Sequence, residues 1–444
     1  MLMIDIKLLR EQREETTKRL MTRDLDVTLL DNVLEIDSKL RRTMTERDSL
    51  RAEINRVSRE VATAKRQGDD AKAEELMSLS KELGSRATVI ERETAQLEDE
   101  RRQYLSVIPN LPDSRVPIGS SEEQNVVERV WSKRTGEMPF DEFELEEFPS
   151  YRRVPHWEIS EQLGILDLPR AAKISGSMFP MFIGSGARVV RALTSFALDE
   201  HENSYLEVRP PTFVRRETMV STGHLPKFEE DAYHMEVDDL FAIPTAEVPL
   251  TSMFKDEILE ERELPVRLTA VTPCFRREAG SAGKDTRGLL RLHEFDKVEL
   301  FSCCTYEQRD EVFNDILERA ESLLRALGLT YRVVLLCTGD LGISSARTID
   351  LEVYSPGVDR WLEVSSVSWF SDYQARRANL RYRRTQDGQV TLLNTVNGSA
   401  LAWPRVWAAI METGREEDGS VTLPLCLHPY LGGRGKISSS GVLS

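Results

Sequence analysis

The feature that most restricts the fold of this chain is a stretch from about Val33 to Leu105 that is dense in charged residues and has almost no glycine or proline. In its first half, apolar residues recur at alternating intervals of three and four, which predicts a helix with a single apolar seam. The seam is interrupted only at Thr43 and Arg47. It consists of Val33, Ile36, Leu40, Leu50, Ile54, Val57, Val61 and Ala64.

A second apolar stripe begins after the polar residues 67–70. It consists of Leu76, Leu79, Leu83, Ala87, Ile90, Leu97 and Tyr104. Two helices of similar length joined by a short polar turn are expected to fold back on each other as an antiparallel coiled-coil hairpin. At about 1.5 Å per residue, roughly 35 residues give an arm on the order of 50 Å long. Because an arm this narrow buries little surface, the rest of the chain must supply the main core.

The outer part of this hairpin has a slight excess of basic side chains, whereas the whole chain has a net charge of −16. Lysine and arginine make most protein contacts with nucleic-acid phosphates, so this part of the arm suits an RNA backbone. The candidate RNA-binding residues are Arg51, Arg56, Arg59, Lys65 and Arg66. A solvated coiled-coil face or a dimerisation surface has the same pattern, and charge alone favours these alternatives over RNA binding.

Length and composition limit the number of domains, the possible partners and the compartment. A chain of 444 residues is too long for one core, so two domains are expected. The net charge argues against non-specific coating of nucleic acid but leaves a local basic surface open. The five cysteines have no metal-ligand spacing, which favours a reducing compartment. The first residues are charged where a signal peptide is apolar, and no stretch reaches transmembrane length, so we expect a cytoplasmic protein without a membrane partner.

A domain boundary is predicted at Pro109, Pro112 and Pro117, which end the second helix. We expect the arm at 1–112, a linker at 113–160 and a second domain at 161–444. In the second domain a helix is predicted from Ala187 to about Glu202. The candidate strands, several of them close in sequence, are Leu240 to Ile243, Val266 to Pro273, Val298 to Ser302, Tyr331 to Leu336, Thr348 to Val353 and Arg360 to Val367. This pattern favours an antiparallel α+β domain.

The segment from Thr272 to Leu300 reads as two strands joined by a glycine-bearing loop with Lys284 and Arg287. Arg276 and Glu278 are two residues apart and are expected on one face of the first strand. Fixed arginines beside a basic loop suit a polyphosphate, although a lone motif of this kind is more often a solvated hairpin. The chain has no GxGxxG after a strand, no GxxxxGK[ST] and no HExxH. Any nucleotide is therefore bound without the common phosphate loops.

Four stretches in order, behind a helical arm, resemble the seryl-tRNA synthetase family of class II aminoacyl-tRNA synthetases over nearly the full chain. They are TGHLPKFEEDAYHMEVDDLFAIPTAEVPLT, TPCFRREAGSAGKDTRGLLRLHEFDKVEL, QARRANLRYRR and LNTVNGSALAWPR. The resemblance implies a tRNA-binding arm and a class II catalytic domain built on an antiparallel sheet. It also implies a homodimer, with Pro211 at the interface.

The resemblance assigns roles to individual residues. Arg276 and Arg405 match the catalytic arginines. The residues that match the ATP site are Arg276, Glu278, Arg291, Phe295, Glu363, Ser366 and Arg405. In the family, the residue at Glu278 reads the adenine amino group. The residue at Phe295 stacks under the adenine ring, and the residue at Arg405 covers the other face of the ring. Glu363 and Ser366 match a Mg²⁺ site, and oxygen ligands suit that cation. The residues that match the serine pocket are Thr245, Glu247, Arg276, Glu299, Asn397 and Ser399.

The implied reaction is the formation of seryl-adenylate from L-serine and ATP, followed by transfer to tRNA(Ser), with tRNA(Sec) left open as a further partner. Several positions depart from the family pattern, namely Met178, Ser204, Glu294, Val367, Trp369, Trp403 and Val406. These keep open a specialised copy for antibiotic resistance or biosynthesis, and, as the weakest alternative, a non-catalytic RNA-binding scaffold. His224, where the family commonly has an amide, is expected to be a polar loop residue, and His293 to be packed.

Overall fold

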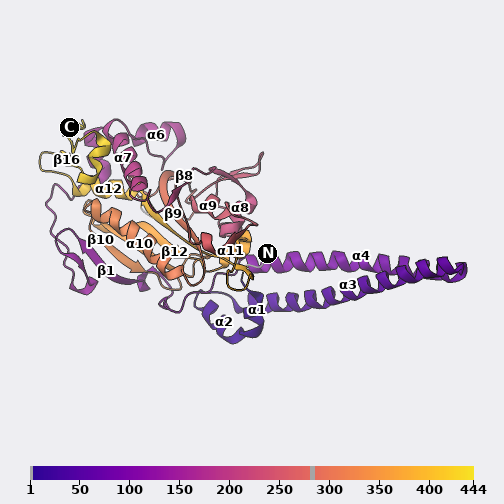
Figure 1. The fold of residues 1–444 in the computed structure, drawn as a ribbon. Helices are drawn as coiled ribbons and strands as arrows, with labels where there is room; N and C mark the ends of the chain where they lie inside the picture. The colour runs from indigo at the N-terminus through magenta and orange to yellow at the C-terminus, as the bar shows by residue number, and fades with distance from the viewer. Residues whose placement is uncertain (1–3, 281–285) are drawn as a thin grey trace. The chain divides into compact units, whose positions relative to one another are not determined.

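The computed structural model describes residues 4–280 and 286–444, which form two compact units, Met1–Ile108 and Pro109–Ser444 (Figure 1). The first unit contains four helices in its described part: α1 (Ile6–Glu11), α2 (Arg13–Met21), α3 (Val27–Gln67) and α4 (Asp70–Ser106). Among the described residues, no helix is long and apolar enough to cross a membrane.

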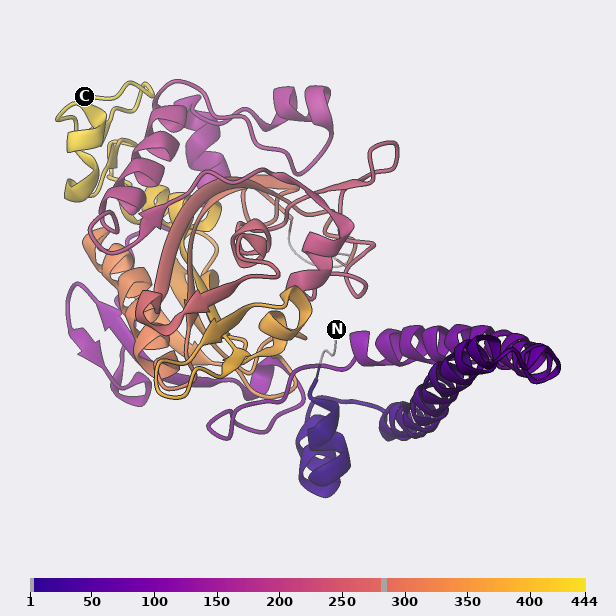
Figure 2. The ribbon, with the colours of Figure 1, turned by 45° about the vertical axis from the view of Figure 1, so that its right-hand side comes forward.

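Capping residues define where α3 begins and ends and where α4 begins. Asp26 accepts a hydrogen bond from the backbone N–H of Thr28 and so caps α3, which ends at Gly68 in the left-handed conformation with φ 74°. Asp69 then caps α4 by accepting from the N–H of Lys72. Figure 2 shows the two helices side by side as they turn back.

The predicted seam joins the two helices. Leu50, Val57, Leu83 and Ile90 form a buried cluster, with Ile54, Val61 and Leu76 packed against it. Leu79 lies outside the seam and is exposed. Near the base of the arm, Asp37 is buried and accepts charge-assisted contacts from Arg10 and Arg101 at 3.3 and 2.7 Å, so part of this packing is ionic.

The second unit is built on a nine-stranded sheet in the order β2-β1-β10-β11-β12-β15-β9-β8-β3. Every neighbouring pair is antiparallel except β3–β8. Its strands are β1 (Val126–Ser132), β2 (Gly136–Met138), β3 (Leu206–Glu207), β8 (Val266–Phe275), β9 (Glu294–Cys304), β10 (Tyr331–Leu335), β11 (Arg347–Ser355), β12 (Arg360–Trp369) and β15 (Asn394–Ala402). The α+β prediction is confirmed.

Small sheets and helices complete the described part of this unit. The further strands are β4 (Phe213–Arg215), β5 (His234–Met235), β6 (Leu240–Ala242), β7 (Ile258–Glu260), β13 (Arg381–Arg383), β14 (Val390–Leu392), β16 (Val421–Thr422) and β17 (Lys436–Ile437). The helices are α5 (His156–Leu163), α6 (Leu168–Ser175), α7 (Ser185–Asp199), α8 (Arg216–Thr222), α9 (Glu247–Ser252), α10 (Arg309–Ala326), α11 (Tyr373–Ala378) and α12 (Trp403–Thr413). The predicted helix at 187–202 is α7, shifted by a few residues.

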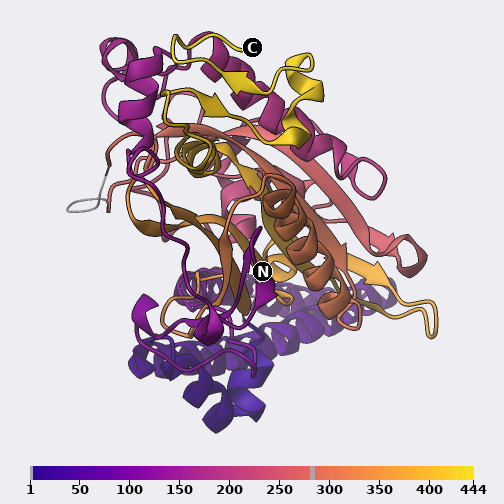
Figure 3. The same ribbon diagram turned by 90° about the vertical axis from the view of Figure 1, so that its left-hand side faces the viewer.

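Two apolar cores lie against the main sheet. Helices α7, α10 and α12 share one of them with the sheet, and Figure 3 shows α10 lying along the strands. On β9 the side chains alternate, with Val298 and Leu300 in this core and Phe301 and Cys303 in the second core beside α9 and α11. The alternation places Lys297 and Glu299 on the same side of β9 as Phe301.

The interval 113–160 is not a linker throughout, because β1 and β2 within it are strands of the main sheet. Val130 is fully buried, Trp131 stacks on Tyr331 with ring centroids 5.8 Å apart, and Arg129 pairs with the buried Glu321. The strand was not recognised from the sequence because it lies near the sheet edge and carries charged residues among its apolar ones. Residues 126–138 therefore belong structurally to the second unit.

Candidate active site

The hairpin β8–β9 supports the site. The two strands pair from Val266 with Cys303 to Phe275 with Glu294, and the connection includes 281–285, so the predicted basic residue Lys284 lies outside the described residues. Arg276 and Glu278 follow the end of β8, which differs from the expected strand face. Glu278 has φ 51°, a left-handed conformation that no strand residue adopts. The left-handed backbone at Glu278 is incompatible with a continued strand, so β8 ends at Phe275.

Backbone and ring contacts hold Arg276 in place. Its N–H donates to the carbonyl of His293 at 2.9 Å, and Nδ1 of His293 lies 2.9 Å from the carbonyl oxygen of Arg276. The ring of His293 also contacts Phe179, with centroids 5.2 Å apart. His293 is therefore a half-buried support of Arg276.

A first cavity, of about 190 Å³, collects six of the seven residues predicted for ATP. Those six are Arg276, Glu278, Arg291, Phe295, Glu363 and Arg405. The cation over the ring of Phe295 is Arg276, at 5.3 Å, and Arg291 is paired with Glu278 at 2.7 Å. Arg405 donates to the carbonyl oxygens of Leu290 and Glu363 at 3.2 and 2.7 Å. An aromatic face among three guanidinium groups suits a nucleotide with its phosphates.

A second cavity, of about 320 Å³, is lined by all six residues predicted for serine. Thr245 donates to Glu299 at 2.7 Å, and both side chains are buried. Ser399 on β15 lies directly opposite Glu299 on β9. Arg276 lines both cavities, so a carboxylate in the second can meet a phosphate in the first at one guanidinium.

Two residues of this cavity's environment were missed by sequence reasoning. Lys297 is buried, forms an ion pair with Glu299 and donates to Thr245 Oγ1 at 3.0 Å. The sequence could have indicated this pair. Lys297 lies in an apolar strand, a buried lysine almost always has a partner, and Glu299 is two residues away on the same face. Gln374 donates to Glu247 at 2.5 Å and accepts from Thr395; it begins the family stretch QARRANLRYRR, but the sequence assigned it no role.

Burial changes the protonation of two groups here. Burial and the nearby Glu299 carboxylate raise the pKa of Glu247 to about 7. Burial, together with Arg276, lowers the pKa of His224 to about 3, so its ring is neutral near pH 7. His224 is thus a wall residue of the site and not only a polar loop residue, with Nδ1 2.8 Å from Thr222 Oγ1.

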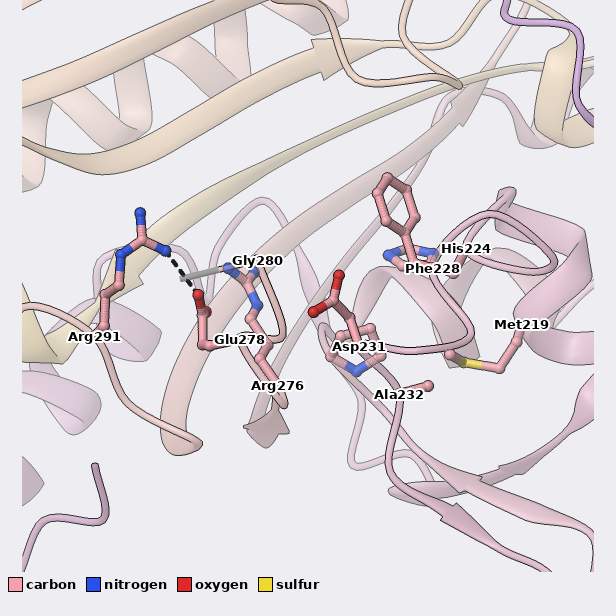
Figure 4. A pocket seen from close by; sticks show the side chains of 10 residues that line it. Met219, His224, Phe228, Asp231, Ala232, Arg276, Glu278, Gly280 and Arg291 are labelled. Atoms are coloured by element: carbon pink, nitrogen blue, oxygen red, sulfur yellow. Dashed lines mark hydrogen bonds and ion pairs between the residues drawn. The ribbon is translucent and has the colours of Figure 1, made fainter. Parts of the chain in front are cut away.

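A third cavity, of about 420 Å³, opens on the other side of Arg276 (Figure 4). In this view Arg276 lies between Glu278 and Asp231, with His224 and Phe228 beyond Asp231. Asp231 accepts from the N–H of Ala279 at 2.8 Å, which anchors the start of the loop. The three cavities therefore meet around Arg276.

Glu363 and Ser366, the predicted metal ligands, lie on β12 and both line the serine cavity. Ser366 pairs in register with Asp350 of β11, whose pKa is raised well above its usual value by burial and by Glu363. Within the described residues no group of three or more acidic, histidine or cysteine side chains could hold a metal by itself. Two oxygen ligands with the remainder from phosphates and water fit a Mg²⁺ ion that arrives with ATP.

The positions that depart from the family pattern at 367, 369, 403 and 406 are buried in the core shared with α7, α10 and α12. Trp369 donates to Asn394 at 3.0 Å, and Trp403 packs edge-on against Phe182 at 4.9 Å. None of these four is among the described residues that line the three cavities. They give no structural support for an altered substrate.

The predicted RNA-binding residues Arg51, Arg56, Arg59, Lys65 and Arg66 are exposed on α3. Arg51 forms an ion pair with Glu91 at 2.8 Å, and Arg56 with Glu60 at 2.8 Å. In the described part of the arm no ion pair engages Arg59, Lys65 or Arg66. These three are therefore the most available cations of the set.

Comparison with known proteins defines the class. Residues 227–414 match the model of the tRNA synthetase class II core domain (G, H, P, S and T), and residues 3–112 match the seryl-tRNA synthetase N-terminal domain. The chain is 44% identical to a serine–tRNA ligase of Syntrophotalea carbinolica, covering 98% of this chain and 100% of the relative. It is 46% identical to one of Geobacillus kaustophilus, with the same coverage.

A solved structure supports the same assignment. The seryl-tRNA synthetase of Pyrococcus horikoshii, complexed with ATP, matches with a TM-score of 0.88 and 36% identity over 98% of this chain and 99% of that one. The chain belongs to the seryl-tRNA synthetase family.

Proposed function

We propose that this chain activates L-serine with ATP to form seryl-adenylate and pyrophosphate, and then transfers the seryl group to tRNA(Ser). The observation that carries this proposal is the junction at Arg276 of a cavity suited to a nucleotide and a second cavity whose lining includes the buried side chains of Thr245, Glu299 and Lys297. Such a junction brings a carboxylate and a phosphate together, which is the geometry that adenylation needs.

In this proposal Arg276 holds the serine carboxylate and the α-phosphate, and the carboxylate, already ionised at neutral pH, attacks in line. Glu299 and Glu247 accept from the serine ammonium and hydroxyl, while Thr245, Asn397 and Ser399 complete the pocket. Polar groups that would be left unpaired with alanine give selectivity for the hydroxyl.

On the nucleotide side Phe295 stacks on the adenine and Glu278 reads its amino group. The ion pair of Arg291 with Glu278, at 2.7 Å, must open for this, which frees Arg291 for the outer phosphates. Arg405 contributes its charge to the phosphates from α12, and we keep the expectation that it covers the adenine opposite Phe295. Glu363 and Ser366 would hold Mg²⁺, which neutralises phosphate charge when bound.

The remaining partners are also proposals. Arg51, Arg56, Arg59, Lys65 and Arg66 contact the tRNA backbone, and tRNA(Sec) is a further candidate. The active form is a homodimer with Pro211 at its interface. The cysteines, free among the described residues, support a reducing, cytoplasmic location.

The test of the catalytic proposal is serine-dependent exchange of labelled pyrophosphate into ATP. We expect exchange with serine, roughly 10⁴-fold less with alanine, and a loss of about 10²- to 10³-fold in Arg276→Ala, because a fixed charge at the reacting phosphate is removed. Arg434→Ala, an exposed arginine distant in sequence from the motifs, is the control and should keep full activity. No exchange with serine would refute the proposal.

A further inference from the structure

His156, the first residue of α5, is completely buried and lies outside the three cavities. Its Nε2 lies 2.9 Å from the backbone nitrogen of Leu289, and its Nδ1 lies 2.9 Å from Oε1 of Glu412. Because the N–H of Leu289 can only donate, Nε2 accepts and carries no proton. The proton is then on Nδ1 and is donated to Glu412, so the ring is neutral with one defined tautomer.

Glu412, at the far end of α12, is a fully buried carboxylate with every oxygen engaged. Oε1 also accepts from the backbone N–H of His156 at 2.9 Å, and Oε2 accepts from Ser355 Oγ and from the N–H of Gly357 at 3.0 Å. A buried charge with this many donors is held in a single geometry. It therefore provides a rigid anchor for the imidazole.

The segment 287–291 is fitted closely to this anchor. Gly288 has φ 59°, and a Cβ at this position would lie 2.4 Å from His156 Nε2. The guanidinium of Arg287 lies 5.0 Å above the ring of Trp157, the next residue of α5. Glycine is needed here both for the backbone conformation and for the close approach.

The segment 287–291 is also hydrogen-bonded to the beginning of α12, at the opposite end of that helix from Glu412. The carbonyl of Leu290 accepts from Nε of Arg405 at 3.2 Å, and Arg291, the next residue, pairs with Glu278. A closed ring of contacts thus runs from Glu412 through His156 to Leu289, and from Leu290 through Arg405 to α12. Two arginines of the nucleotide cavity adjoin this ring: Arg405 is part of it, and Arg291 follows Leu290 in sequence.

We propose that His156 is a positioning residue for ATP, joining α12 to the segment 287–291 so that Arg291 and Arg405 face the phosphates together. The inference rests on the proposed function, since it needs the nucleotide in that cavity. It requires no contact between His156 and the substrate. The effect falls on ATP and not on serine, because the described residues that line the serine cavity include none from the segment 287–291 or from α12.

Two isosteric variants separate the two hydrogen bonds of the ring. In His156→Asn the amide can replace Nδ1 and donate to Glu412, but nothing accepts from Leu289. We expect the KM for ATP in pyrophosphate exchange to rise roughly tenfold, as for one buried hydrogen bond left unmade, with the KM for serine changed less than twofold. His156→Gln places an oxygen near Nε2 and should recover part of the ATP affinity.

The matched control is Ser355→Ala, which removes another donor to Glu412 and leaves Leu289 bonded to His156. It should lower the thermal midpoint but leave the KM for ATP unchanged. Gly288→Ala is an independent variant that displaces the segment from its own side, and it should reproduce the ATP defect with His156 intact.

The outcomes are distinguishable. A normal KM for ATP in His156→Asn and Gly288→Ala, or an equal defect in Ser355→Ala, would overturn the positioning role while the unaltered protein remains active. Absence of serine-dependent exchange in the unaltered protein would instead overturn the proposed function, and this inference with it.

Discussion

At the scale of single residues, the serine cavity has an unusual balance of charge. Glu247 and Glu299 are both buried, and Lys297 is the cation paired with Glu299. These three side chains carry one negative charge in excess when both carboxylates are ionised, and burial, with the nearby Glu299 carboxylate, raises the pKa of Glu247 to about 7. The ammonium of a bound serine would complete the balance, so substrate binding and the ionisation of Glu247 should be linked.

We therefore predict a pH dependence for serine. Below pH 7 Glu247 is mostly protonated and attracts the ammonium weakly; above pH 7 it is ionised and attracts it fully. With ATP saturating, kcat/KM for serine should rise about tenfold from pH 6 to pH 8 and then level off, as expected for one ionisation of the free enzyme. Glu247→Gln should have a lower and flat profile. An unchanged slope in this variant would assign the ionisation to another group.

At the scale of elements, the arm separates its stabilising residues from its candidate binding residues. One stripe of α3 and α4 is apolar and closes the hairpin, whereas Arg59, Lys65 and Arg66 are exposed on α3. When a lysine or arginine binds a phosphate, the counterions condensed on the nucleic acid are released. A cation without a carboxylate partner can do this without first breaking an ion pair, so these three residues are the best candidates for RNA contact. Arg51 and Arg56 must first leave Glu91 and Glu60.

We predict that replacing Arg59, Lys65 and Arg66 together by alanine weakens tRNA binding. The slope of log affinity against log salt should fall by roughly one unit per lost contact. Filter binding over a salt series measures both quantities. Serine-dependent exchange, which needs no tRNA, is the control and should stay at its original rate. A wild-type salt slope in the triple variant would show that these residues do not contact phosphates.

At the scale of the whole molecule, the main sheet ends at the short strand β3, which is followed by Pro210 and Pro211. Leu206 of this edge strand is 65% exposed, and Phe213, at the edge of the separate sheet β4-β6-β5, is 51% exposed. Exposed apolar residues along a sheet edge are a liability for a monomer and are suited to an interface. We expect this edge to lie in the proposed homodimer.

Leu206→Glu should then convert the protein from a dimer of twice 50.6 kDa to a monomer at micromolar concentration. Sedimentation equilibrium measures the mass directly. Ile118→Glu is the matched control, because Ile118 is also highly exposed but is distant from β3 in sequence. A dimer that persists in Leu206→Glu, or is lost in both variants, would contradict this assignment.

The sequence by itself determined the elements that have a clear period. The helical hairpin followed from apolar spacings of three and four, and β8 to β12 from short apolar runs between turns. Strand β15 was missed as a strand because eight of its nine residues are buried, so it lacks alternation, and it is rich in Asn, Thr, Ser and Gly. Strand β1 was missed because it lies near the sheet edge and carries charged residues among its apolar ones.

Only the tertiary structure decided which distant residues meet. The family motifs indicated Arg276, Phe295 and Arg405, but not that Lys297 neutralises Glu299 or that Gln374 holds Glu247. His156 and Glu412 are 256 residues apart, and no local pattern relates them. The physical reason is that periodicity reports which side of an element is buried, whereas hydrogen bonds between buried groups depend on positions and orientations that only the packed fold defines.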